Sequence, residues 1–324
     1  MTVKTHPAFE LLRTEKISSL KVEYQEFRHT VTGAQHIHLA SDNKENVFLV
    51  ALRTVPEDST GVAHILEHTA LCGSEKYPVR DPFFMMIRRS LNTFMNAFTS
   101  SDWTAYPFAS QNRKDFNNLL SVYLDSVFFA RLDPLDFAQE GHRLEFETPE
   151  DSMSDLTFKG VVYNEMKGAM SSINSTLWQT VTKYLYPTST YHNNSGGDPT
   201  AIPDLSYDQF KAFYDIHYHP SNSIFITFGD ITAREHQANF QDLALHRFER
   251  LNCHITVTDE HRYSKPQHVE EHYAFNDPDS DENHTHILLS WLLGDSTDLV
   301  ETMKARLLSL SLIHISEPTR RRGI

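Results

Sequence analysis

The stretch HILEH, residues 64–68, places two histidines four positions apart, with a glutamate directly before the second. On an α-helix, residues i and i+4 lie on one face about 6 Å apart along the axis, so His64 and His68 can bind one cation together. Glu67 follows His64 by three positions and can approach a water molecule beside that cation. The pattern predicts a helical metal site with its own general base. The alternative is a pair of surface histidines next to a solvated glutamate.

The chemistry of this pattern favours zinc. Two neutral imidazoles suit a tetrahedral cation, and bound zinc lowers the pKa of a water molecule from about 15.7 towards 7, so a nearby carboxylate can take its proton. The order of residues is the inverted HxxEH form of the zinc-peptidase motif. A catalytic zinc needs a third protein ligand, and Glu165 in GVVYNEMKGAM is the candidate. A lone helical glutamate is usually solvated, however, and spacing alone does not identify Glu165 as a ligand.

The composition is that of a soluble globular protein. The 324 residues suffice for about two domains, and 40% hydrophobic with 22% charged residues is ordinary. A net charge of −14 argues against a nucleic-acid partner. The two cysteines, Cys72 and Cys253, lack CxxC spacing and indicate a reducing compartment. Because we find no apolar run of roughly 18 residues and no apolar leader, we expect a cytoplasmic protein of bacterial type without a membrane partner.

The order of predicted elements indicates an α+β fold, since strands and helices mix without strict alternation. Residues rich in β-branched and apolar side chains predict strands at 35–39, 47–55, 96–108, 223–228 and 286–293. Helical spacing predicts helices at 61–71, 114–129, 160–177 and 208–218, and a further helix near Ser296.

The domain boundaries follow from a polar segment around Pro266. We assign residues 1–260 to a first domain that contains HILEH, and residues 261–309 to a linker and the truncated start of a second domain. Residues 310–324 are predicted to be a non-native tail, because LSLIHISEPTR resembles a translated sequencing adaptor. The alternative for that tail is a native basic segment with solvated arginines.

Five blocks of sequence together resemble the M16 metallopeptidases, the pitrilysin or insulinase-like family, and within it the presequence-protease branch. The resemblance covers nearly all of residues 5–300. The blocks are HILEHTALCGSEKYPVRDPF (64–83), NTFMNAFTSSDWTAYPF (92–108), FKGVVYNEMKGAMSS (158–172), SGGDPTAIPDL (195–205) and YHPSNSIFITFGDI (218–231).

The resemblance implies a mixed, mostly antiparallel sheet packed by helices, and one zinc ion per active site. It implies that His64, His68 and Glu165 bind the zinc, with Glu67 as general base. It also implies that the first domain is the zinc-binding catalytic domain and that the second is related to it. Other branches carry an additional glutamate upstream of the third ligand, and this sequence has Phe158 there. No supporting carboxylate is therefore predicted at that position.

The resemblance also implies how substrate binds. Asn96, Ala97 and Phe98 align with the family's edge strand, to which an extended peptide adds as a further strand through main-chain hydrogen bonds. Phe98 is expected to form a pocket wall, or alternatively to be an ordinary core aromatic.

The function expected from these features is a zinc metalloendopeptidase that degrades short, unstructured peptides. The resemblance implies an enzyme made of two halves, and we expect that the C-terminal half of the same polypeptide is not part of this chain. We therefore expect this chain alone to be weakly active or inactive. One alternative is a non-catalytic protein of the same fold that binds peptides or subunits, and another is a metal-binding protein without hydrolytic activity.

Overall fold

The computed structural model describes residues 3–252, 254–274 and 285–316. The chain forms two units, Met1–Glu260 and His261–Ile324. Cys253 and the last eight residues of the predicted tail lie outside the described residues. The domain assignment from the sequence stays a prediction.

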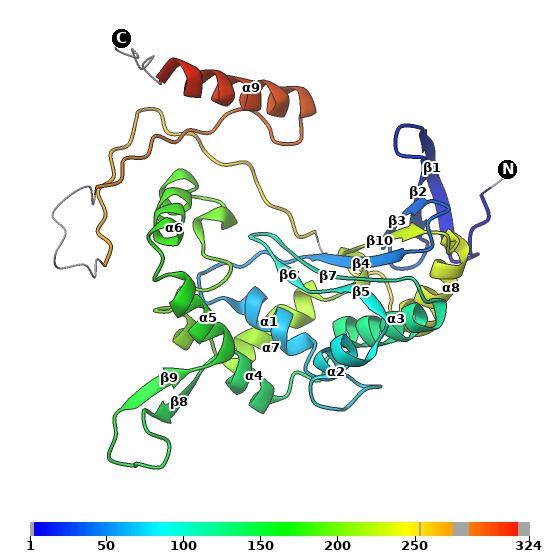
Figure 1. Cartoon of the computed structure of the whole chain (residues 1–324), viewed down its shortest axis with the longest axis horizontal. Helices are drawn as coiled ribbons and strands as arrows, with labels where there is room; N and C mark the ends of the chain where they lie inside the picture. The colour runs from blue at the N-terminus through cyan, green and yellow to red at the C-terminus, as the bar shows by residue number, and fades with distance from the viewer. Residues whose placement is uncertain (1–2, 253, 275–284, 317–324) are drawn as a thin grey trace, which may run out of the picture. The chain divides into compact units, whose positions relative to one another are not determined.

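The first unit is built on an eight-stranded sheet in the order β1-β2-β3-β10-β4-β7-β5, with β6 also paired to β7 (Figure 1). Only the β3–β10 pair is parallel. The strands are β1 (Phe9–Ile17), β2 (Val22–His29), β3 (Gln35–Ala40), β4 (Asn46–Arg53), β5 (Asn92–Met95), β6 (Phe98–Thr99), β7 (Trp103–Ser110) and β10 (Ser223–Gly229). The α+β class with a mixed, mostly antiparallel sheet is thereby confirmed.

Helices cover one face of this sheet. Along β4, every second side chain from Asn46 to Leu52 is buried and the intervening ones are partly exposed, as expected for a strand with one packed face. Figure 1 shows α1, α3 and α7 on the same side of the sheet. The helices of the unit are α1 (Val62–Ala70), α2 (Pro82–Arg89), α3 (Arg113–Phe128), α4 (Pro134–Glu140), α5 (Val161–Ala169), α6 (Ile173–Leu185), α7 (Tyr207–His217) and α8 (Ala233–Leu243).

Two predicted elements are each divided in the structure. The predicted strand 96–108 is a hairpin, because a turn between β6 and β7 closes with a hydrogen bond from Ser100 N to Trp103 O at 2.8 Å. The predicted helix 160–177 is two helices. The Ser171 hydroxyl donates to Gly168 O at 2.6 Å, and such side-chain bonds compete with the helical backbone pattern.

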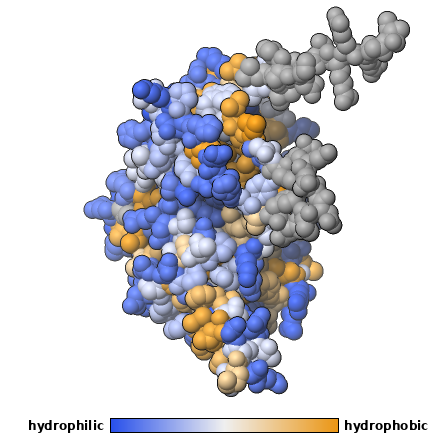
Figure 2. Space-filling model, turned by 90° about the vertical axis from the view of Figure 1, so that its left-hand side faces the viewer, coloured by the Kyte–Doolittle hydropathy of each residue, from blue (hydrophilic) through white to orange (hydrophobic). Residues whose placement is uncertain are grey.

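A second, two-stranded sheet projects from the first unit. It consists of β8 (Arg143–Phe146) and β9 (Leu156–Lys159), paired antiparallel. Several of its apolar side chains are exposed, among them Leu144 and Leu156. Figure 2 shows hydrophobic and hydrophilic side chains interspersed on the side of the molecule that lies at the left of Figure 1.

The second unit contains one described helix, α9 (Leu299–Ser316). It begins three residues after Ser296, where the sequence places a helix. The strand predicted at 286–293 is wrong, since those residues form no regular element. Ile287 and Leu289 are 85% and 84% exposed, so this segment lacks the buried face that a strand requires, and none of the described residues pairs with it as a strand. Among the described residues, no helix is long and apolar enough to cross a membrane.

Candidate metal centre

Helix α1 presents His64, Glu67 and His68 on one face. These three side chains are only partly buried, whereas other positions of the helix, including Ile65, Leu66 and Thr69, are buried against the core. The helix is preceded by Gly61, whose φ of 73° favours glycine. The apolar face of α1 therefore fixes the direction in which the two imidazoles point.

His64 is held by a backbone carbonyl. Its Nδ1 lies 2.9 Å from the carbonyl oxygen of Gly196. A carbonyl only accepts hydrogen bonds, so His64 Nδ1 carries the proton and Nε2 is left with a free lone pair. Gly196 belongs to the loop of SGGDP, and a Cβ atom at Gly61 would lie 2.9 Å from that same oxygen. Because position 61 has no side chain, the loop can lie close enough to α1 to place the carbonyl oxygen of Gly196 beside His64 Nδ1.

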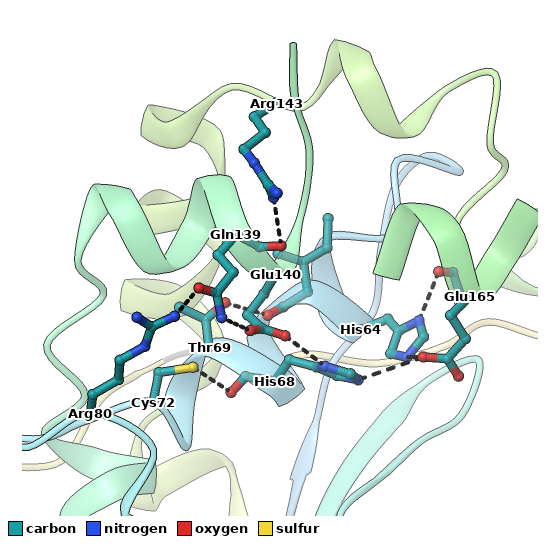
Figure 3. Close-up of polar contacts among 11 residues, drawn as sticks. His64, His68, Thr69, Cys72, Arg80, Gln139, Glu140, Arg143 and Glu165 are labelled. Carbon is teal, nitrogen blue, oxygen red and sulfur yellow. Dashed lines mark hydrogen bonds and ion pairs between the residues drawn. The ribbon is translucent and has the colours of Figure 1, made fainter. Parts of the chain in front are cut away.

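His68 is held by a carboxylate. Its Nδ1 lies 3.1 Å from Oε2 of Glu140, the last residue of α4, so the proton again belongs on Nδ1. The second oxygen of Glu140 accepts a hydrogen bond from Gln139 Nε2 at 3.0 Å. Figure 3 shows these contacts, together with the contact between Gln139 and Arg80.

The free Nε2 atoms of both histidines face Glu165 on α5. Glu165 Oε2 lies 3.8 Å from His64 Nε2 and 3.9 Å from His68 Nε2 (Figure 3). One ligand atom from each residue lies within 4.8 Å of the others, so these side chains can hold a metal ion. Ligand atoms around a tetrahedral zinc with bonds of about 2.0–2.2 Å lie roughly 3.3–3.6 Å apart, so the two distances between Glu165 and the histidines are slightly longer than those of a bound site.

The electrostatics of His68 and Glu140 are coupled. Burial lowers the pKa of His68, but the hydrogen bond to Glu140 and the negative charges of Glu67, Glu140 and Glu165 outweigh it and raise that pKa. Burial raises the pKa of Glu140, and the hydrogen bonds from His68 and Gln139 outweigh it and lower that pKa. Glu140 is therefore an ionised acceptor near neutral pH.

A cavity of about 290 Å³ opens beside this cluster. Its lining includes Glu67 and His68 from α1, apolar side chains of α2 such as Phe84 and Ile87, and Asn96 and Ala97 from the sheet edge. Cys72 also lines it, and burial raises the pKa of its thiol. Phe98 is absent from the lining. Its ring lies 6.4 Å from that of Phe94, and it is 41% exposed, so the structure places it neither in this wall nor in the core.

The sequence carries no local signal that marks Glu140 and Gly196 as partners of the two histidines. The Asp133-Pro134 start and Gly141 after the last turn are signals for the short helix α4. Nothing in those signals shows that its last side chain contacts His68. At the position of the absent upstream glutamate, Phe158 is 37% exposed and its ring lies 6.3 Å from that of His142. The carboxylate that contacts His68 thus comes from helix α4, whereas position 158 lies in strand β9.

An α+β fold that carries the inverted motif His-x-x-Glu-His is typical of the inverted-motif zinc metallopeptidases. The family model described as Insulinase (Peptidase family M16) matches residues 53–175, and the model Peptidase M16 inactive domain matches residues 204–317. The chain belongs to peptidase family M16. The second match begins within the first structural unit and extends into the second.

Curated relatives agree with this assignment. The chain is 51% identical over 283 residues to "Presequence protease, mitochondrial" of Danio rerio, covering 87% of this chain and 28% of the relative. The protein of the same name from Mus musculus is 50% identical over 289 residues, covering 88% and 28%. That from Gibberella zeae is 43% identical over 309 residues, covering 94% and 30%. The chain thus spans less than a third of the length of these relatives.

A solved structure shares the fold. The crystal structure of a protease from Helicobacter pylori has a TM-score of 0.57 and 17% identity, and the match covers 79% of this chain and 54% of that one.

The expectation of a bacterial-type cytoplasmic protein is wrong, because the relatives carry the name of a mitochondrial protein. The first residues could not decide the compartment, since a chain that spans part of its relatives does not reveal what precedes it.

Proposed function

We propose that this chain is the zinc-binding part of a metalloendopeptidase that degrades short, unstructured peptides, presequences among them. The observation that carries the proposal is the convergence of His64 Nε2, His68 Nε2 and Glu165 Oε2, with Glu67 in the adjoining cavity. The name of the relatives supports the substrate class and a mitochondrial site of action.

Each side chain has a distinct role in this proposal. His64, His68 and Glu165 hold the ion, and the Nδ1 contacts of the two histidines keep their Nε2 lone pairs available. Zinc bound there would polarise the scissile carbonyl and acidify a water molecule. Glu67 takes the proton of the attacking water and delivers it to the departing amine.

The edge formed by β5 and β6 suits an added peptide strand. Asn96 N and Ser100 N donate to β7 at Pro107 O and Trp103 O. Along an antiparallel strand, every second residue hydrogen-bonds to the same neighbouring strand. Ala97 and Thr99 therefore direct their main-chain N–H and C=O groups away from β7. Asn96 and Ala97 also line the cavity that contains Glu67. A peptide paired here would place its backbone beside the proposed base.

We further propose that cleavage requires the remainder of a longer polypeptide. The matched relatives are more than three times as long as the matched segment. This chain supplies the metal centre and one sheet edge, and the remaining sequence would close the site around the peptide. Peptidase assays therefore belong on the full-length polypeptide, whereas zinc binding can be measured on this chain.

The experiment that tests the proposal is Glu67→Gln in the full-length polypeptide. Zinc content and cleavage of a synthetic presequence peptide are measured together. We expect one zinc per chain in both proteins and a loss of cleavage of about 10²–10⁴-fold in the variant. Glu57→Gln, at an exposed loop residue, is the matched control with unchanged cleavage. Undiminished cleavage by Glu67→Gln, or a wild type without zinc, would refute the proposal.

A further inference from the structure

We infer that Glu140 is a positioning residue for the metal centre, which orients His68 and offsets part of the charge of the bound cation. This inference rests on the proposed zinc site. Glu140 lies in α4 and does not reach the metal position itself; it acts through the 3.1 Å contact between its Oε2 and His68 Nδ1. A carboxylate bonded to the distal nitrogen of a metal-binding histidine fixes the ring and increases its strength as a ligand.

The side chain of Glu140 is itself held in place. It is 10% exposed, and its two oxygens contact different partners, His68 Nδ1 and Gln139 Nε2. The end of α4 is secured by Arg143, whose Nη1 donates to the carbonyl oxygens of Ala138 and Gln139 at 3.3 and 3.4 Å. Neither the helix end nor the carboxylate is free to turn away from His68.

The hydrogen bonds from His68 and Gln139 lower the pKa of Glu140 despite its burial, so this carboxylate faces His68 as an anion. A negative charge in the last turn of a helix opposes the helix dipole, and a cation held between His68 and Glu165 would offset that charge. The two carboxylates, Glu140 and Glu165, would then balance the two positive charges of a zinc ion.

The two histidines differ in how they are supported. His64 donates to a neutral carbonyl, that of Gly196, whereas His68 donates to a charged group. Loss of Glu140 would leave a partly buried Nδ1–H without its acceptor and free the ring of His68 to rotate. The Gly196 contact of His64 would remain. We therefore expect weaker metal binding rather than a complete loss of the site.

The test uses this 324-residue chain with Glu140→Gln and Glu140→Ala. Zinc affinity is measured by competition with a chromogenic chelator, the site geometry by the visible absorption of bound Co²⁺, and the folding of the metal-free protein by thermal unfolding. We expect the zinc dissociation constant to rise about 10–100-fold in Glu140→Ala and less in Glu140→Gln, with an altered Co²⁺ spectrum. Both variants remove a carboxylate whose pKa is lowered by its hydrogen bonds to His68 and Gln139, so their metal-free forms should melt slightly lower than the wild type, and zinc affinity is compared at a temperature where all three proteins are folded.

Glu147→Gln is the matched control, because it removes the same charge from an exposed position close in sequence. Its zinc affinity should equal that of the wild type. A wild type that binds zinc while Glu140→Gln and Glu140→Ala bind it equally well would overturn this inference and leave the proposed function standing. Failure of the wild type to bind zinc would instead overturn the proposed function. Loss of metal-free stability in both variants at unchanged affinity would assign Glu140 a purely structural role and also overturn the inference.

Discussion

Gly160 lies against the carbonyl oxygen of Gly141 so closely that a Cβ atom at position 160 would overlap it. Gly141 ends α4 and Gly160 precedes the first residue of α5. The two helices carry Glu140 and Glu165, the carboxylates on either side of His68. The relative placement of these carboxylates thus depends on a backbone contact that only glycine at position 160 permits.

Gly160→Ala is expected to destabilise the first unit by about 1–3 kcal/mol, because the added methyl group must displace backbone. It should also weaken zinc binding, since α4 and α5 would move apart. Urea unfolding and chelator competition measure the two effects. Gly168→Ala is the control in the same helix. A Cβ atom at position 168 meets open space, so the free energy of unfolding of Gly168→Ala should equal that of the wild type or rise by up to about 1 kcal/mol. Equal stability of the two variants would contradict the prediction.

Glu165→Ala is expected to reduce zinc affinity by at least about 10²-fold, because it removes one of three protein ligands. The Glu165 side chain is 54% exposed, so metal-free unfolding should hardly change. Native mass spectrometry with and without added zinc would show the loss. Asn164→Ala, at a neighbouring exposed position of α5, should bind zinc as the wild type does. Tight zinc binding by Glu165→Ala would remove this residue from the ligand set.

A group of buried histidines lies away from the metal centre. His36 and His38 on β3 and His236 on α8 are each at most 1% exposed. Thr227 Oγ1 lies 2.8 Å from both His36 Nε2 and His38 Nδ1. Within the described residues, neither ring nitrogen of His236 has a hydrogen-bond partner. Burial lowers the pKa of all three, that of His38 to about 4. Neighbouring histidines lower the pKa of His36 and His236 further.

The stability of the metal-free chain is expected to fall as pH decreases below about 6.5. The unfolded histidines bind protons near that pH, whereas the buried ones stay neutral, so the unfolded state is favoured by up to about 1.4 kcal/mol per pH unit for each such residue. The stability they confer is fully present above pH 6.5 and is lost as pH falls towards 4. Urea unfolding at pH 7.5, 6.5 and 5.5 measures this slope.

His236→Phe should reduce that slope, because it replaces a titrating ring by an apolar one of similar shape. At pH 7.5 its stability should match or exceed that of the wild type, since two unpartnered nitrogens are removed. His246→Phe, at an exposed position, should leave the slope unchanged. An identical pH dependence of His236→Phe and the wild type would show that this cluster does not control acid unfolding.

The zinc helix could be predicted from local sequence, and much of its surroundings could not. Helical spacing alone separates the buried Ile65 and Leu66 from the face that carries His64, Glu67 and His68, because that separation depends only on the 3.6-residue period. Glu165 needed the resemblance to a family, since a half-exposed helical glutamate has no local signal. Glu140 was missed altogether. Its role depends on which helix end packs beside α1, and single-sequence reasoning does not supply that tertiary information.

The strand predictions show the same limit. Residues 223–228 are a strand in the structure because β3 and β4 pair with them on both sides. Residues 286–293 have an equally apolar composition but no paired neighbour among the described residues, and they form no strand. Composition indicates that a segment can be a strand, whereas pairing decides whether it is one.

Ala97→Pro is expected to impair peptide binding without disturbing the sheet. The Ala97 N–H points away from β7 and contacts only the exposed side chain of its neighbour, Asn96 Oδ1 at 2.9 Å, among the described residues. Proline removes this donor and leaves the Asn96–Pro107 pairing intact. In the full-length polypeptide, kcat/KM for a presequence peptide should fall about tenfold, since one main-chain hydrogen bond to the substrate is worth roughly 1–1.5 kcal/mol. Ala97→Ser keeps the N–H and should cleave normally. Equal kcat/KM for the proline and serine variants would exclude strand addition at this edge.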